Sequence, residues 1–202
     1  MSSCSIVRDM RKTAALFALC LTAAPSPAEE ITSAYTTFNL EACEVVEKGD
    51  EHVYAGTWKC KGLDGIDIFQ SSADDRSFAG FGRETGNNCA SLKTFSPFNT
   101  ALSPVEWRIR KGKAFAAIER WSVVTDDAGN SGTWLVVNAL RDKEACHVHY
   151  VSGSYPKANE AARRAADTLA QGFDCENDVP TFDSKIGPPP IELNACKDMA
   201  RE

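Results

Sequence analysis

The sequence predicts an α+β domain, in which an antiparallel meander sheet carries one C-terminal amphipathic helix and is stapled by disulfides. Three observations predict this fold class. Segments of alternating polarity, separated by turn signals, recur between residues 53 and 152. The apolar period then changes from two residues to three and four over 156–172, which is the change from strand to helix. Six cysteines follow residue 28, an even number that suits disulfides in an exported chain.

The first 28 residues have the composition of a secretory signal peptide. A basic flank, an apolar run over 13–24 and a segment of small residues that ends at Ala28 follow one another. The apolar run is too short to span a bilayer, which needs about 20 residues, so we expect no membrane span. A buried amphipathic helix is the alternative. We expect cleavage after Ala28 and a mature protein that is periplasmic or secreted.

Charge and length bound the class of protein. The chain has 22 Lys and Arg residues against 28 Asp and Glu residues, and cleavage after Ala28 would remove three basic residues and one acidic residue, leaving 19 against 27. Because an acidic surface repels phosphate groups, we expect no nucleic-acid partner. The remaining length of about 174 residues suits one domain with its own core. We place this domain at 31–178 and expect the proline-rich segment 179–202 to be an extended, unpacked tail.

The first strands are expected to form a three-stranded meander, preceded by a short helical turn near 39–43. The strands are expected at 53–61, 66–72 and 76–83. Turns at Asp64-Gly65 and Asp74-Asp75 separate them, and Asp-Gly between apolar runs is a strong hairpin signal.

A second group of four strands is expected at 105–110, 114–124, 133–140 and 145–152. In the first of them Val105, Trp107 and Ile109 point one way and the charged residues between them point the other way, which is the period of a half-buried strand. Because short turns join all four strands, we expect them to be antiparallel neighbours.

The segment 156–172 predicts the helix. Its apolar stripe consists of Ala158, Ala161, Ala162, Ala165, Ala166, Leu169, Ala170 and Phe173. These residues recur at the helical period, and because most of them are alanine the helix can lie close against the sheet. Pro156 suits the start of the helix and Gly172 its end. A solvated or partner-binding helix is the alternative.

The cysteines expected to form disulfides are Cys43, Cys60, Cys89, Cys146, Cys175 and Cys196. Six cysteines allow fifteen complete pairings. A bridge from Cys146 to Cys175 would staple the end of the helix to the strand before it, and closing about 30 residues is worth roughly 3.5 kcal/mol. A bridge from Cys43 to Cys60 would tie the N-terminal segment to the first strand for roughly 3 kcal/mol. Cys89 and Cys196 are then left to pair by elimination.

The segment EACHVHYVSG, residues 144–153, raises the alternative of a metal site. Side chains alternate along a strand, so His147 and His149 are expected to share one face and Cys146 to lie on the other. Two imidazoles about 7 Å apart are a workable pair of ligands for zinc or copper. The other interpretation gives Cys146 to the core and leaves both imidazoles half exposed without a ligand. The one further histidine, His52, is distant in sequence.

Glu119 and Arg120 stand out because they lie inside an otherwise apolar strand, where a buried charge must be paired. We interpret them as an exposed cross-strand ion pair, with catalysis as the alternative. Gly80, Gly82 and Gly86 only loosely resemble a dinucleotide-binding loop, and glycines that relieve a twisted strand explain them better.

The turn after the second of the four strands offers a weak calcium site at Asp126, Asp127 and Asn130. Carboxylates are common in turns without any ligand, which is the alternative interpretation. A serine nucleophile elbow of the Gly-x-Ser-x-Gly type is absent from the sequence.

Several segments together resemble a known group of proteins. These segments are SAYTTFNLEAC, GTWKCKG, SFAGFG, PFNT, VEWRIRKGKAFAAIERW, ACHVHYV, ANEAARRAAD and FDC. In this order they resemble a group of small exported proteins of alphaproteobacteria that have no assigned function. The similarity covers roughly residues 33 to 178. It implies one domain behind a signal peptide and supplies no active-site residues, and Cys89, Cys196 and the proline-rich tail lie outside the segments that carry it.

We therefore expect an exported, non-enzymatic periplasmic protein that binds an unknown protein or small-molecule partner in the cell envelope. Two alternatives remain from the residues. One is a zinc- or copper-binding protein that uses His147 and His149; otherwise we expect no cofactor. The other is a hydrolase, which would need a pocket with a carboxylate of perturbed pKa.

Overall fold

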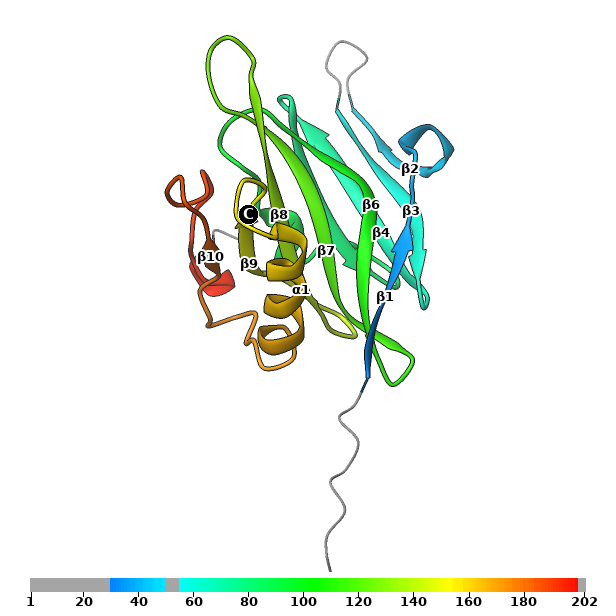
Figure 1. The fold of residues 1–202 in the computed structure, drawn as a ribbon. Coiled ribbons are helices and arrows are strands. Elements are labelled where there is room, and N and C mark those ends of the chain that lie inside the picture. The colour runs from blue at the N-terminus through cyan, green and yellow to red at the C-terminus, as the bar shows by residue number, and fades with distance from the viewer. Residues whose placement is uncertain (1–29, 50–54, 200–202) are drawn as a thin grey trace, which may run out of the picture.

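The structure is a computed structural model that describes residues 30–49 and 55–199. The expected signal peptide, residues 1–28, lies outside the described residues. Two sheets face one another, and one helix covers the far side of the larger sheet (Figure 1). The fold class is α+β, as the sequence predicts. None of the helices in the described ranges is both long and apolar enough to cross a membrane.

The larger sheet has six strands in the order β1-β6-β7-β8-β9-β10. Their bounds are β1 (Ile31–Thr36), β6 (Asn99–Arg110), β7 (Lys113–Val124), β8 (Ser131–Leu140), β9 (Ala145–Ser152) and β10 (Thr181–Asp183). Neighbouring strands are antiparallel except β9 and β10, which are parallel. Parallel neighbours need a long crossover connection, and α1 (Ala158–Leu169) provides it.

The smaller sheet has the order β2-β3-β4-β5. Its strands are β2 (Glu44–Lys48), β3 (Gly56–Leu63), β4 (Ile66–Ala73) and β5 (Arg76–Gly82). The last three are the expected meander, although residues 53 and 54 of its first predicted segment lie outside the described residues. Asp64 and Gly65 have φ of 55° and 72°, as a tight hairpin turn requires. The expected helical turn is η1 (Leu40–Ala42).

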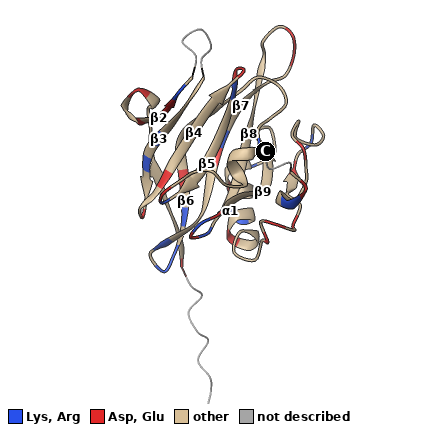
Figure 2. Cartoon of the chain, turned by 180° about the vertical axis from the view of Figure 1, so that it is seen from behind, with Lys and Arg blue, Asp and Glu red and all other residues tan. Residues whose placement is uncertain are grey.

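The presence of two sheets corrects the expectation of a single meander sheet. The chain leaves β1 at Thr36, crosses to the smaller sheet for β2 to β5 and returns at β6, whose residue Val105 pairs with Thr36. Figure 2, seen from behind, shows β3, β4 and β5 on the side of the larger sheet that faces away from α1. We call this side of the larger sheet the inner face. Trp107 and Phe81 pack between the sheets with their ring centroids 5.7 Å apart.

The helix α1 packs on the opposite side, the helix face, through Ala161, Ala162, Ala165 and Ala166, all of which are buried. Polar contacts hold its direction. The guanidinium of Arg108 donates to both carboxylate oxygens of Asp167 over 2.8 and 2.7 Å, and Arg163 donates to Glu106 over 2.6 Å. Bidentate arginine–carboxylate pairs fix geometry as well as contributing energy, so both packing and charge set the position of the helix.

Three disulfides tie these layers together. They join Cys43 to Cys60, Cys89 to Cys196 and Cys146 to Cys175, the three pairs expected from the sequence. The bridge Cys146–Cys175 connects the strand before α1 to the segment after it, as expected.

The C-terminal segment corrects a second expectation, since residues 180–199 are packed against the domain. Ile191 is buried in the cluster around Phe95 and Trp134. The ammonium group of Lys93 donates to the backbone oxygen of Asn194 over 2.7 Å, and the Ser96 N–H donates to the Pro190 carbonyl over 2.8 Å. Prolines leave backbone carbonyls available as acceptors, which is how this segment is held. Residues 200–202 lie outside the described residues.

Candidate functional site

The two histidines of β9 do not share a face. His147 lies opposite Asn138 in the ladder, whereas His149 lies opposite Val137, and a register shift between Val137 and Asn138 marks a β-bulge. Because adjacent residues of β8 point to opposite faces, the bulge turns His147 to the inner face and His149 to the helix face. The expectation that the imidazoles share one face and are half exposed is therefore wrong. They are 2% and 6% exposed and cannot ligate one ion together.

His147 is held in the core by Tyr150, whose hydroxyl lies 2.8 Å from its Nδ1. Burial, and then the positive charge of Lys93, lowers the pKa of His147 to about 3. Thr181 contacts His149 Nδ1 at 2.7 Å, and Asp183 approaches its Nε2 at 3.5 Å. Over residues 30–49 and 55–199, His, Cys, Asp and Glu side chains form no group of three or more that could hold a metal ion.

Glu119 and Arg120 also point to opposite faces, so they do not form the expected ion pair. Arg120 lies on the helix face and donates to Asn159 Oδ1 over 2.8 Å. Glu119 lies on the inner face, is 1% exposed and accepts from Gln70 Nε2 over 3.0 Å. Burial raises the pKa of Glu119 to about 7, and the nearby Gln70 and Trp121 side chains act in the opposite direction.

Glu119 belongs to a row of buried polar side chains on the inner face. Asn138 of β8 lies opposite His147 of β9 on one side and opposite Ala117 of β7 on the other. Glu119 follows Ala117 by two residues and therefore lies on the same face. Buried atoms that make no hydrogen bond of normal geometry include Glu119 Oε2, Trp121 Nε1, Asn138 Oδ1 and His147 Nε2. Unpartnered buried polar atoms are rare in native proteins and call for an explanation. Their concentration here makes the inner face the chemically unusual region of the described structure.

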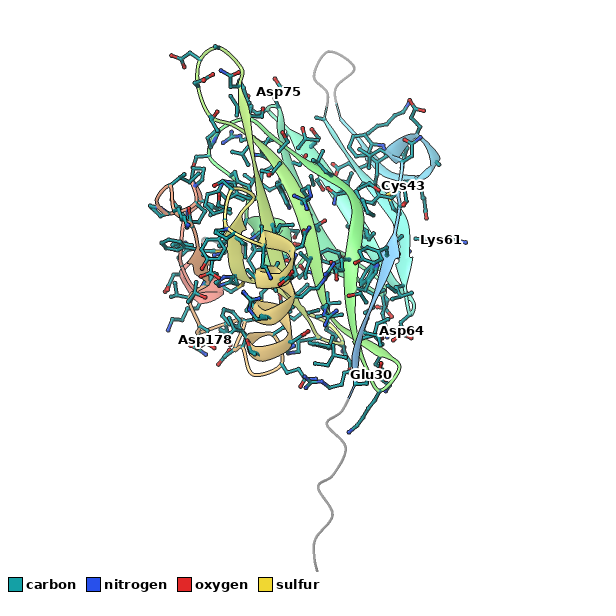
Figure 3. The ribbon with its side chains drawn as sticks, in the orientation of Figure 1. Glu30, Cys43, Lys61, Asp64, Asp75 and Asp178 are labelled. Atoms are coloured by element: carbon teal, nitrogen blue, oxygen red, sulfur yellow. A yellow bond between two sulfur atoms is a disulfide. The ribbon has the colours of Figure 1, made fainter. Side chains whose placement is uncertain are left out.

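A groove of about 640 Å³ opens beside this row, between the smaller sheet and β6. Trp58 and Gln70 line it from the smaller sheet, and the segment 99–103 of β6 lines it from the larger sheet. It also reaches Ser122 of β7 and Ser131 of β8, whose register places them on the helix face. The groove therefore reaches both faces of the larger sheet at the edge of β6. Figure 3 labels Asp75, which lines the groove, and Cys43, which lines a second pocket that shares Phe38 and Asn39 with the groove.

Among the residues that the structure describes, no strand neighbours the edge of β6 in this groove. β1 pairs with β6 only from Val105 to Arg110. The Val124 N–H donates to the Phe98 carbonyl, and because ladder bonds alternate, the backbone groups of Ala101 point away from β7. At one end the Asn99 N–H donates to the Asp75 carbonyl over 3.1 Å, and at the other end the Phe38 N–H donates to Ser103 Oγ over 3.0 Å. Between these contacts the open edge faces the groove.

The lining of the groove is acidic and hydroxyl-rich. Its charged residues within the described structure are Glu41 and Asp75, so an anionic ligand would be repelled. The hydroxyls of Thr100 and Ser122 make no hydrogen bond to another described residue. The Asn99 side chain is occupied, because it accepts from the Ser77 N–H of β5 and donates to carbonyls of the loop before β6. Trp58 adds an aromatic surface. These groups suit a neutral or cationic ligand that carries hydrogen-bonding groups.

A hydrolase would need a carboxylate of perturbed pKa that lines a pocket. The pKa of Glu119 is perturbed, but its carboxyl group does not line the groove and lies behind Gln70. At the weak calcium site, both oxygens of Asp126 are engaged by Ala128 and Asn130 within their own turn. That engagement is the ordinary role of an aspartate in a turn.

The glycines Gly80, Gly82 and Gly86 allow close packing of the loop after β5. A Cβ on Gly86 would lie 2.3 Å from the ring of Phe69, and one on Gly80 would lie 2.2 Å from the Gly86 carbonyl. Their role is therefore steric, in line with the structural interpretation of these glycines.

Sequence reasoning missed Gln70 and Ala101. A signal for Gln70 was present, because the period of its strand places it on the face of Ile66 and Ile68, where a polar residue is unexpected. No signal in the sequence marks Ala101, since its importance comes from where β1 ends. No family model matches the chain, and no curated protein or solved structure matches it either.

Proposed function

We propose that this protein is an exported, non-enzymatic binding protein that takes up a short extended peptide segment in the groove, as an added strand on the open edge of β6. Disulfides are typical of oxidising compartments outside the cytosol, and three disulfides together with the signal-peptide pattern support export to the periplasm or beyond. The observation that carries the proposal is the open backbone edge at Ala101 inside the 640 Å³ groove.

The geometry of the groove supports strand addition. An added strand alternates its side chains between the two faces of the sheet, and the groove offers space on both faces, toward Gln70 on one and Ser122 on the other. Backbone hydrogen bonds supply affinity in this mode of binding, and the side-chain recesses supply specificity. From Asn99 to Ser103 the edge extends for about 14 Å at 3.4 Å per residue. A segment of about four residues fits this length.

The charge of the groove supports a particular class of peptide. Glu41 and Asp75 lie at its rim, so a Lys or Arg side chain on the peptide would be attracted and a carboxylate repelled. The matched test is Ala101→Pro against Ala101→Val. Proline removes the outward N–H but leaves the ladder to β7 intact, and proline is tolerated at a strand edge. Valine keeps the N–H and also enlarges the side chain.

The assay is an array of N-acetylated, C-amidated tetrapeptides built from Ser, Val, Tyr, Lys and Glu, followed by titration of the best binder. We expect saturable binding that Lys favours and Glu disfavours. Ala101→Pro should weaken binding by about three- to tenfold, since one hydrogen bond is worth about 0.5–1.5 kcal/mol, and Ala101→Val should weaken it less. Equal binding by both variants, or no saturable binding by any tetrapeptide, refutes strand addition. Binding of neutral saccharides in place of peptides refutes the peptide class.

A further inference from the structure

Gln70 is the polar side chain through which the groove meets the buried row of the inner face. It projects from β4, is 3% exposed and lines the groove. Its Nε2 donates to Glu119 Oε1 over 3.0 Å, across the space between the two sheets. One end of this carboxamide is therefore fixed by the core, and the other end belongs to the binding site.

The ionisation of Glu119 determines whether the NH₂ group or the oxygen of the Gln70 carboxamide faces it. An ionised carboxylate can only accept hydrogen bonds, so it must face the NH₂ group of Gln70 and not its oxygen. The oxygen, Oε1, then points away from Glu119. No other described residue donates a hydrogen bond to this oxygen. Because it is also missing from the fully buried atoms that lack a partner, it must be accessible to solvent. Its free lone pairs are consequently directed to the groove.

We propose that Glu119, acting through Gln70, makes the groove select ligands that present an N–H donor to Gln70 Oε1. The inference rests on the proposed peptide-binding function and names the chemistry that the site recognises. Glu119 touches no ligand, so it is a positioning residue. A site built to pair with an N–H discriminates against the analogue that lacks it, because the polar group of the site is then left unpaired.

Protonation of Glu119 would remove this control, since a neutral carboxylic acid also donates and would allow Gln70 to turn around. Gln70 from β4 and Trp121 from β7 contact Glu119. The other titratable groups of this region are His147 and Tyr150 on β9, which contact one another, and Lys93 from the loop before β6, whose charge acts on His147. Burial holds the pKa of His147 at about 3, so it stays neutral above pH 5. Burial raises the pKa of Tyr150, which therefore stays neutral as well.

Lys93 adds no titration in the acidic range. Its pKa is lowered to about 8 by burial, and it stays charged as the pH falls from 7 to 5.5. Lys93 gains its remaining charge between pH 8 and pH 7, so Glu119, with its pKa at about 7, is the group of this row whose charge changes between pH 7 and pH 5.5.

The experiment compares the best-binding tetrapeptide with ester analogues in which one backbone N–H at a time is replaced by oxygen. We expect one position at which the wild-type protein prefers amide over ester by about three- to tenfold at pH 8. In Gln70→Met, which has nearly the same shape but only a weak thioether acceptor, this preference should fall to about one. In the wild-type protein it should also fall as the pH is lowered to 5.5, and Glu119→Gln should make it independent of pH. Glu41→Gln, at the groove rim, should change affinity for Lys-containing peptides but not this preference.

The outcomes separate the two proposals. If no tetrapeptide binds, both proposals fail. If peptides bind and Ala101→Pro weakens them, but Gln70→Met keeps the full amide preference at every position, only the inference about Gln70 is overturned. If the wild-type protein prefers the amide over the ester equally at pH 8 and pH 5.5, Glu119 does not orient Gln70, even where Gln70→Met behaves as expected. Circular dichroism of each variant establishes that the binding comparison is made on folded protein.

Discussion

Replacing Glu119 with Gln should make the protein less sensitive to alkaline conditions. Burial raises the pKa of this carboxyl from its ordinary 4.5 to about 7 in the folded state. Between these pH values the folded protein holds a proton that the unfolded chain has released, so folding loses stability as the pH rises. At 1.36 kcal/mol per pKa unit, the total loss is about 3 kcal/mol by pH 8. Glutamine keeps the acceptor for Gln70 and cannot ionise.

The assay is urea unfolding at pH 4.5, 6, 7 and 8, followed by tryptophan fluorescence of the buried Trp107 and Trp121 with the disulfides intact. The free energy of unfolding of Glu119→Gln minus that of the wild type should rise by about 3 kcal/mol from pH 4.5 to pH 8. That rise corresponds to a relative shift of the urea midpoint by about 1–3 M. Any constant cost of the substitution cancels in this comparison.

Glu160→Gln is the matched control. Glu160 is exposed on α1 and pairs with Lys157 at the surface, and such pairs contribute little, so this variant should parallel the wild type. If Glu119→Gln also parallels the wild type, the carboxyl of Glu119 ionises as it does in water, and the reasoning from its burial is refuted. A difference of the opposite sign would mean that the folded state stabilises the charged form.

Three further predictions concern the inner face, a disulfide and the helix. His147→Phe should flatten the acid limb of the stability profile, because the folded state resists protonation of His147 down to about pH 3; the wild type should lose about 4 kcal/mol relative to the variant between pH 6.5 and 3, measured by acid unfolding. Replacing Cys146 and Cys175 by Ser opens a bridge with a separation of 29 residues and should lower the free energy of unfolding by about 3.5 kcal/mol; a loss below about 1 kcal/mol would contradict the chain-entropy account. Ala162→Leu should cost about 1–3 kcal/mol by overpacking α1 against the sheet, whereas Arg164→Leu on the exposed side should leave the thermal midpoint nearly unchanged.

The elements that the sequence predicts correctly are those with a local signature. The alanine stripe of α1 and the Asp64-Gly65 hairpin turn each depend on neighbours within a few residues. The pairing of Cys146 with Cys175 could be inferred because the helix between them has a defined start and end. The pairing of Cys89 with Cys196 follows once the other pairs are assigned. Local periodicity and cysteine spacing therefore carry much of the fold.

The features that escaped prediction depend on contacts between distant segments. Both groups of strands alternate in the same way, so the pattern cannot say that they belong to two sheets. The bulge beside Asn138 reverses the direction of His147 relative to His149 without any change in composition. The groove exists because β1 stops at Thr36 and leaves the edge at Ala101 uncovered, and the point at which a pairing stops is a tertiary property.

The order of the cysteines along the chain has a consequence for biosynthesis. Cys43 and Cys60 are consecutive, but the bridge Cys89–Cys196 encloses the bridge Cys146–Cys175. If the protein is exported, as we propose, an oxidant that joined thiols in the order in which they leave a translocation channel would link position 89 to position 146, which is a non-native pair. The native pairing can form only after Cys196 has emerged. Before that, either a mispaired intermediate forms and is later reshuffled, or a chaperone shields position 89 and prevents the mispairing. Maturation in a host that lacks a disulfide isomerase should therefore trap a scrambled isomer.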